Sequence, residues 1–141
     1  MDVAARINSC LVGNHLLNVE RREHDWIFLF ENKVGLQVEC RWRILVEGRI
    51  AFGDKDHAQQ FGLPEPIDGA DRSNSLLLNK TIQGVKIRED TGDLTIIFTD
   101  RCALEVLNTS CGYEGWQIID GAGLHVVAMG GGELSLWNDP D

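Results

Sequence analysis

The short segment Tyr113-Glu114-Gly115-Trp116 combines side chains that are suited to contact with a ligand. It contains the single tyrosine of the chain, and Glu114 adds a carboxylate between two aromatic residues. Aromatic side chains are enriched at contact surfaces, and a carboxylate can hold a cation or accept a proton. Tyr113, Glu114 and Trp116 are therefore candidate binding residues. The alternative is structural, with Trp116 in the core and the other two side chains fixing a loop by hydrogen bonds.

Two arginines and a histidine are further candidates. Arg41 and Arg43 lie on the polar face of an alternating segment, where they would either bind an anion or form cross-strand ion pairs. His57 follows Asp54 and Asp56 and could join them in holding a cation. An acid-rich helix N-terminus accounts for the same pattern without a ligand.

Other chemistry finds little support in the residue types and their spacing. None of the histidines stands at metal-ligand spacing with another His or Cys, so we expect no metal. Gly130-Gly131-Gly132 lacks the Lys-Ser/Thr pair of a phosphate-binding loop, and we expect a bend there and no cofactor. Cys111 is the one candidate for a reactive thiol. No catalytic residues are assigned, and the chain is expected to be non-enzymatic.

Composition restricts the partner and the compartment. The formal net charge is −9, which disfavours binding to nucleic acid or to an anionic membrane and suits a basic protein partner. No apolar run reaches the length of a membrane span, and no secretory signal is recognised. The cysteines show no CxxC spacing. We expect a cytoplasmic protein with reduced thiols.

An internal repeat organises the chain. Residues 25–38 align without a gap on residues 93–106, an offset of 68 (93 − 25). Trp42 aligns with Trp116 at an offset of 74 (116 − 42), so six residues (74 − 68) are inserted between residues 107 and 116. Such a repeat indicates internal duplication. Because the first half makes the same connection without the insertion, the longer loop is free to carry binding.

The apolar pattern predicts strands in both halves. Residues 26–30 are apolar at every position, and residues 36–46 alternate with period two and predict one continuous strand. The other expected strands begin near residues 16, 50, 82, 94, 104, 116, 124 and 133. Residues 3–11 are compatible with one or two helical turns, and residues 138–141 form an acidic tail.

A linker separates the halves. We expect a single domain over 1–141, with pseudo-repeat halves 13–53 and 79–137 joined by residues 54–78. Within the linker, residues 54–62 predict a short helix that ends at Gly62, and residues 68–74 are polar and expected to be mobile. The fold class is all-β with minor α content. Two antiparallel meanders pack against each other as a sandwich or a partly open barrel.

Several separated motifs resemble a bacterial family known only as a domain of unknown function. These motifs are Trp42-Arg43-Ile44, Asp56 to Pro66 (DHAQQFGLPEP), Thr91-Gly92-Asp93-Leu94, Leu104-Glu105-Val106, Gly112 to Trp116 (GYEGW) and Gly130 to Leu134 (GGGEL). The resemblance spans most of the chain and implies a domain boundary, but it implies no activity.

The leading functional hypothesis is a binding protein, such as an immunity-type inhibitor of a basic toxin. The alternative is a small-molecule-binding or hydrolytic protein that uses the Tyr113–Trp116 loop. That alternative requires a concave site that gathers Glu114 with groups such as Arg41, Arg43, His57 or Cys111. A homodimer is a third possibility, in which the partner is a second copy of the chain.

Overall fold

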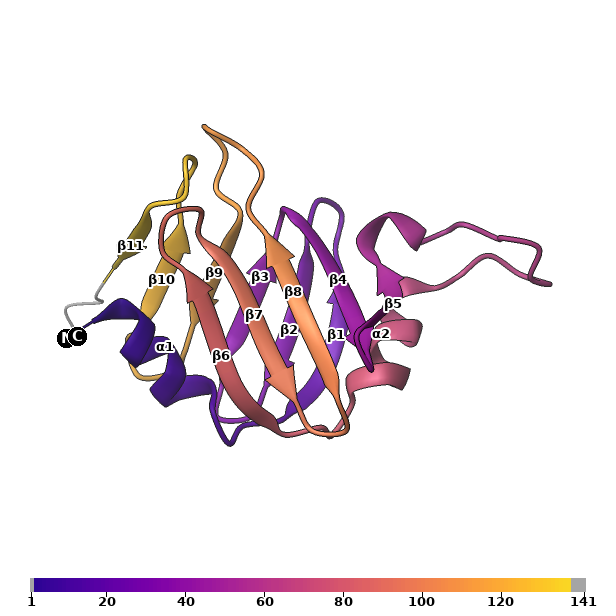
Figure 1. Ribbon diagram of the computed structural model, residues 1–141, viewed down its shortest axis with the longest axis horizontal. Helices are drawn as coiled ribbons and strands as arrows, with labels where there is room; N and C mark the ends of the chain where they lie inside the picture. Colours follow the sequence, from indigo (N-terminus) through magenta and orange to yellow (C-terminus); the bar gives the residue numbers. More distant parts are fainter. Residues whose placement is uncertain (1, 138–141) are drawn as a thin grey trace.

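Two antiparallel sheets face each other in the computed structural model, which describes residues 2–137 (Figure 1). The six-stranded sheet has the order β1-β2-β3-β9-β10-β11, and the five-stranded sheet has the order β5-β4-β8-β7-β6. The acidic tail predicted at residues 138–141 lies outside the described residues. The elements are α1 (Val3–Leu11), β1 (Leu16–Arg21), β2 (Trp26–Phe30), β3 (Gly35–Val38), β4 (Arg41–Val46), β5 (Arg49–Gly53), the 3₁₀ turn η1 (Asp54–Asp56), α2 (Gly69–Leu77), β6 (Ile82–Arg88), β7 (Asp93–Phe98), β8 (Cys102–Leu107), β9 (Trp116–Ile119), β10 (His125–Ala128) and β11 (Leu134–Leu136).

Each sheet takes strands from both halves of the chain. β1 to β3 pair with β9 to β11, and β6 to β8 pair with β4 and β5. The junctions are β3 against β9, with Leu36 opposite Ile118, and β4 against β8, with Ile44 opposite Leu104. The mostly-β sandwich predicted from sequence is confirmed. However, the two halves do not each form one sheet, because both sheets contain strands from both halves.

The same series of elements occurs twice. A helix with an aspartate N-cap, Asp2 or Asp68, precedes each set of strands. The first strand of each set carries a register shift at its start, at Leu16/Asn18 and at Ile82/Gly84. His15 and Thr81, which precede these two strands, form a bridge with each other. The order of the elements in the two halves thus corresponds, while the pseudo-repeat and a common origin of the halves stay predictions.

The chain changes sheets where the sequence predicts one unbroken strand. β3 ends at Val38 and β4 begins at Arg41, so residues 39–40 carry the chain from the six-stranded sheet to the five-stranded one. Alternation persists through the crossing, with Val38 and Trp42 buried and Cys40 half-buried between them. Because the period of two never breaks, the pattern could not reveal the change of sheet.

Two helices lie along the open sides of the sandwich. α1 packs against β6 and buries Ile7 and Leu11, whereas α2 packs against β1 and β5 (Figure 1). The predicted helix at residues 54–62 is wrong beyond η1. The predicted mobile stretch at 68–74 is also wrong, because it forms the start of α2, where the Asp68 side chain accepts hydrogen bonds from the amides of Ala70 and Asp71.

Aromatic residues form one end of the shared core. Trp26 and Phe28 each make an edge-to-face contact with Trp42, with ring centroids 4.9 and 5.1 Å apart, respectively. Trp42 and Trp116 are each about 1% exposed. Burial of such rings supplies a large share of the hydrophobic free energy of folding. Within residues 2–137, no helix is long and apolar enough to cross a membrane.

Candidate functional site

The inserted residues form the second of two connections between the sheets. The first crossing uses residues 39–40, whereas the second, between β8 and β9, uses residues 108–115. The amides of Glu39 and Cys40 both donate to the carbonyl of Gly115, at 2.8 and 3.1 Å, so the two crossings are hydrogen-bonded to each other. The longer 108–115 loop therefore rests on the shorter crossing.

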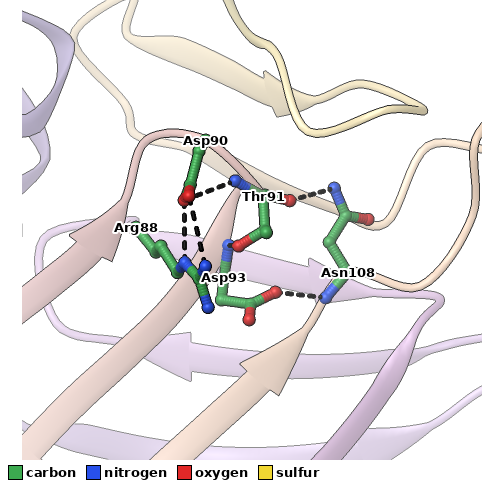
Figure 2. Close-up of polar contacts among 5 residues, drawn as sticks. All are labelled: Arg88, Asp90, Thr91, Asp93 and Asn108. Carbon is green, nitrogen blue, oxygen red and sulfur yellow. Dashed lines mark hydrogen bonds and ion pairs between the residues drawn. The ribbon is translucent and has the colours of Figure 1, made fainter.

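Asn108 fixes the start of the 108–115 loop. Its backbone amide donates to Asp93 Oδ1 at 2.9 Å, and its side-chain Nδ2 donates to the carbonyls of Thr91 and Met129, each at 3.2 Å. Figure 2 shows the contacts with Asp93 and Thr91, beside the Arg88–Asp90 ion pair of the same turn. Asn108 thus connects β8 to the β6–β7 turn and to the end of β10.

Trp116 fixes the other end of the loop from inside the core. Its Nε1 donates to the carbonyl of Gly92 at 2.7 Å, and its ring is buried. Gly115 has no room for a side chain, because a Cβ there would collide with Asn108 Oδ1. Of the three candidates in the segment, Trp116 therefore has the packing role that the sequence left open as an alternative.

Tyr113 and Glu114 are exposed at the tip of the loop. Ser110 Oγ accepts hydrogen bonds from the amides of Gly112 and Tyr113, at 3.1 and 2.9 Å, and shapes the tip of the loop. Gly131 donates to the Ser110 carbonyl at 2.9 Å. Tyr113 is 82% exposed although the backbone beneath it is held on both sides. Such a loop presents an aromatic ring with little backbone entropy left to lose on binding.

A hollow of about 260 Å³ opens beside this loop, and we call it the acidic hollow. Glu39 and Glu114 contribute carboxylates to its lining, and His24, Cys40 and Tyr113 also line it. Burial raises the pKa of the Cys40 thiol to about 12, so this thiol stays protonated at neutral pH. The acidic hollow is therefore suited to a cation and offers no thiolate nucleophile at Cys40.

A second hollow of about 410 Å³ lies on the outer side of β4 and β5, and we call it the arginine hollow. Arg41 and Arg43 line it together with Lys55, and Thr109 borders both hollows. Arg41 Nε lies 3.1 Å from Asp54 Oδ1, and Arg43 Nε lies 2.6 Å from Glu105 Oε1. The two arginines thus form ion pairs with Asp54 and Glu105, and within residues 2–137 neither forms an ion pair with Glu114.

His57 lies apart from both hollows, at the base of the segment that precedes α2. The amide of Gly69 donates to its Nδ1 at 2.9 Å, and its ring meets Trp26 edge-on at 5.4 Å between centroids. His57 therefore joins α2 to the aromatic core. Among residues 2–137, no group of three or more His, Cys, Asp and Glu side chains is placed to hold a metal ion.

The structure brings together some of the predicted residues and adds others. Tyr113 and Glu114 share one hollow, Arg41 and Arg43 share the other, and Trp116 and His57 line neither. Sequence reasoning missed Glu39, His24 and Asn108. Glu39 stood in the alternating segment as an ordinary polar residue, and only the crossing places it beside the inserted loop.

Comparison with known proteins identifies the family. The model of a family of unknown function, DUF6188, matches residues 27–138. No curated protein and no solved structure matches the chain. The matched range includes both crossings, the residues that line the arginine hollow and, except for His24, those that line the acidic hollow. It covers well over half of the sequence. The chain belongs to the DUF6188 family of unknown function.

Proposed function

We propose that this protein is a non-enzymatic binding protein whose partner is a basic protein. The observation that carries the proposal is Tyr113, which is 82% exposed on a loop that hydrogen bonds hold in place. It stands beside the acidic hollow with the carboxylates of Glu39 and Glu114. A ring next to carboxylates suits a lysine or arginine side chain, which can pair with the acids and stack on the ring.

Charge supports the same kind of partner. The chain carries 22 acidic and 13 basic residues, and part of the basic set is already paired, as in Arg22–Asp25 and Arg88–Asp90. A negative surface accelerates the approach of a positive partner. An immunity-type inhibitor of a basic toxin in the bacterial cytoplasm is the biological form we propose. We also propose that an internal duplication produced the two halves and that the inserted loop was added to one of them.

The test is co-purification from the native host at low salt, with immobilised wild type and a Tyr113→Ala/Glu114→Gln double variant. We expect a basic protein that the wild type retains, with affinity lower by at least about tenfold for the variant, since hot-spot residues contribute about 2 kcal/mol or more. Ile119→Ala is the matched control, because Ile119 is exposed on β9 and lies outside both hollows. Equal recovery with the double variant would refute the proposal.

A second candidate function rests on the arginine hollow. Its volume is about 410 Å³, and its lining has three cationic side chains against the two carboxylates of Asp54 and Asp56, an excess of positive charge that suits a small anionic ligand. Binding would require the ligand to compete with Asp54 and Glu105 for the two guanidinium groups. Titration with small carboxylates and inorganic phosphate, monitored by thermal shift, should stabilise the wild type and leave an Arg41→Gln/Arg43→Gln variant unchanged if this function holds.

A further inference from the structure

The hairpins that follow the two crossings, β4–β5 and β9–β10, continue differently. In the second half, β10 is followed by a tight bend and by β11, which pairs with its outer edge, with Val126 opposite Leu136 and Ala128 opposite Leu134. In the first half, the corresponding strand β5 is the last strand of its sheet. No strand among residues 2–137 pairs with the outer edge of β5. The chain leaves β5 through η1 and runs outward.

The outward segment is an ordered arm, which we define as residues 58–66. Figure 1 shows it projecting beyond the sandwich between η1 and α2. Hydrogen bonds from the amide of Ala58 to the carbonyl of Ile67, and from the amide of Ile67 to the carbonyl of Gln59, close its base at 2.8 Å each. Every residue of the arm is exposed. In order of elements, this arm takes the place that β11 takes in the second half.

The arm holds apolar side chains in solvent on a strained backbone. Phe61 is 68% exposed and Leu63 is 42% exposed. Ala58 and Phe61 have positive φ angles of 68° and 46°, which cost roughly 1 kcal/mol or more each in residues with a Cβ. Extension of residues 59–63 into a strand would release the strain at Phe61, in exchange for the hydrogen bond from the amide of Leu63 to the carbonyl of Gln60. An exposed ring on a strained turn indicates a segment adapted to a contact that the single chain does not make.

The same chain offers a matching surface at the edge of β5. Ile50 is 60% exposed there and lines the arginine hollow together with Leu107. α2 packs against β5, but no strand of residues 2–137 pairs with the outer edge of β5. An unpaired edge with an exposed aliphatic side chain is a template for an added strand. The arm and the receiving edge are adjacent in sequence, so two chains can satisfy each other symmetrically.

We propose that two copies of the chain exchange their arms. Residues 59–63 of one copy add to β5 of the other, as β11 adds to β10, and Phe61 enters the arginine hollow beside Ile50. Pro64 and Pro66 lack amide hydrogens and limit the added strand to the residues before them. Reciprocal exchange closes a twofold dimer, in which the outer edge of β5 is paired in both copies.

Charge favours a second copy over a basic protein at this surface. The arm has one charged residue, Glu65, within an otherwise neutral sequence. A like-charged copy can approach a neutral arm with less repulsion than it would meet elsewhere on a chain with a net charge of −9. The dimer should therefore strengthen as salt screens the remaining repulsion, whereas binding of a basic protein should weaken.

Sedimentation of the purified chain tests the proposal, over loading concentrations from about 1 to about 500 µM, where small interfaces dissociate. We expect a monomer–dimer equilibrium whose dissociation constant falls as salt rises. Phe61→Asp should raise that constant by about tenfold or more. Tyr113→Ala should leave it unchanged, so that failure of this proposal is distinct from failure of the proposed function. A monomer at every concentration, or a Phe61→Asp variant that dimerises like the wild type, would overturn the exchange.

Disulfide trapping identifies the contact between chains. In a Cys111→Ser background, an Ile50→Cys chain is mixed with a differently tagged Phe61→Cys chain and oxidised. We expect a cross-linked heterodimer that contains both tags. Leu17→Cys replaces Ile50→Cys in the control, because Leu17 is 50% exposed on β1, at the edge of the other sheet. Equal cross-linking of Phe61→Cys to Leu17→Cys, or none to Ile50→Cys, would show that the arm does not seat at β5.

Discussion

At the scale of single residues, the aligned aspartates Asp25 and Asp93 have different partners. Asp93 accepts the amide of Asn108 and so holds the inserted loop. Asp25 accepts hydrogen bonds from Arg22 at 2.7 and 2.6 Å and from Gln37 at 2.6 Å. The repeat located both residues, but it could not give their partners, which come from neighbouring turns and strands. Residue type alone identifies Tyr113 and Glu114 as candidate binding residues. Asn108 could not be identified in this way, because its contribution depends on hydrogen bonds to backbone carbonyls of other strands and turns.

Asp25 leads to a pH-dependent prediction. Its hydrogen bonds with Arg22, followed by that with Gln37, hold the pKa of this carboxyl below its usual value of 3.8. The stabilisation is present above pH 3.8 and is lost as the pH falls through the lower, folded-state pKa. We expect Asp25→Asn to reduce the free energy of unfolding by about 2 kcal/mol at pH 7, the range of a charged hydrogen bond.

Urea denaturation of wild type and variant, measured from neutral pH to below pH 3.8, checks this expectation. The difference between the two proteins should shrink at the acid end. Glu23→Gln is the control, because the Glu23 side chain is 87% exposed. A difference that stays constant with pH would contradict the assigned role of the Asp25 charge.

At the scale of elements, α2 shows why part of the fold escaped prediction. The strands at 26–30 and 82–107 follow apolar patterns that the sequence makes visible. The buried positions of α2 are Gly69, Ser73 and Leu77, and two of these three side chains are too small or too polar to register as an apolar stripe. Helix formation there depends on the Asp68 cap and on a close fit against Trp26. The position of α2 therefore depends on tertiary contacts, which the local sequence pattern does not show.

Gly69 tests that fit. A Cβ at this position would lie 2.5 Å from the Trp26 ring and 2.9 Å from the Phe52 ring. Although alanine is the better helix former by about 1 kcal/mol, we expect Gly69→Ala to destabilise the protein by about 1–3 kcal/mol through overpacking. Thermal and urea unfolding measure this change. Gly84→Ala is the control, since a Cβ at Gly84 meets no neighbour within 4 Å, and an equal effect at the two glycines would exclude overpacking as the cause.

At the scale of the whole molecule, interleaving makes the halves depend on each other. The sequence indicated two similar sets of strands and a sandwich, and both follow from local patterns. The exchange of strands between sheets could not be inferred, because the pairings of β3 with β9 and β4 with β8 join residues far apart in sequence. The alternation of apolar and polar residues shows which face of a strand is buried, but it does not show which strand pairs with it.

Fragments provide the measurement at this scale. We expect residues 1–66 and residues 67–141 to be unfolded when separate, because each fragment would leave an apolar sheet face and the edge of β3 or β8 unpaired. An equimolar mixture should regain the strand signal in circular dichroism as the two fragments complete both sheets. A half that folds cooperatively on its own would contradict the interdependence.

The unequal lengths of the two crossings have an evolutionary consequence. Residues 39–40 are a minimal bridge that also supports Gly115, so changes there would disturb both sheets at once. The 108–115 loop can vary at its tip without altering strand register, because Asn108 and Trp116 secure its ends. One connection can therefore preserve the scaffold while the other diversifies. Descendants of such a chain could acquire new specificities without needing to refold.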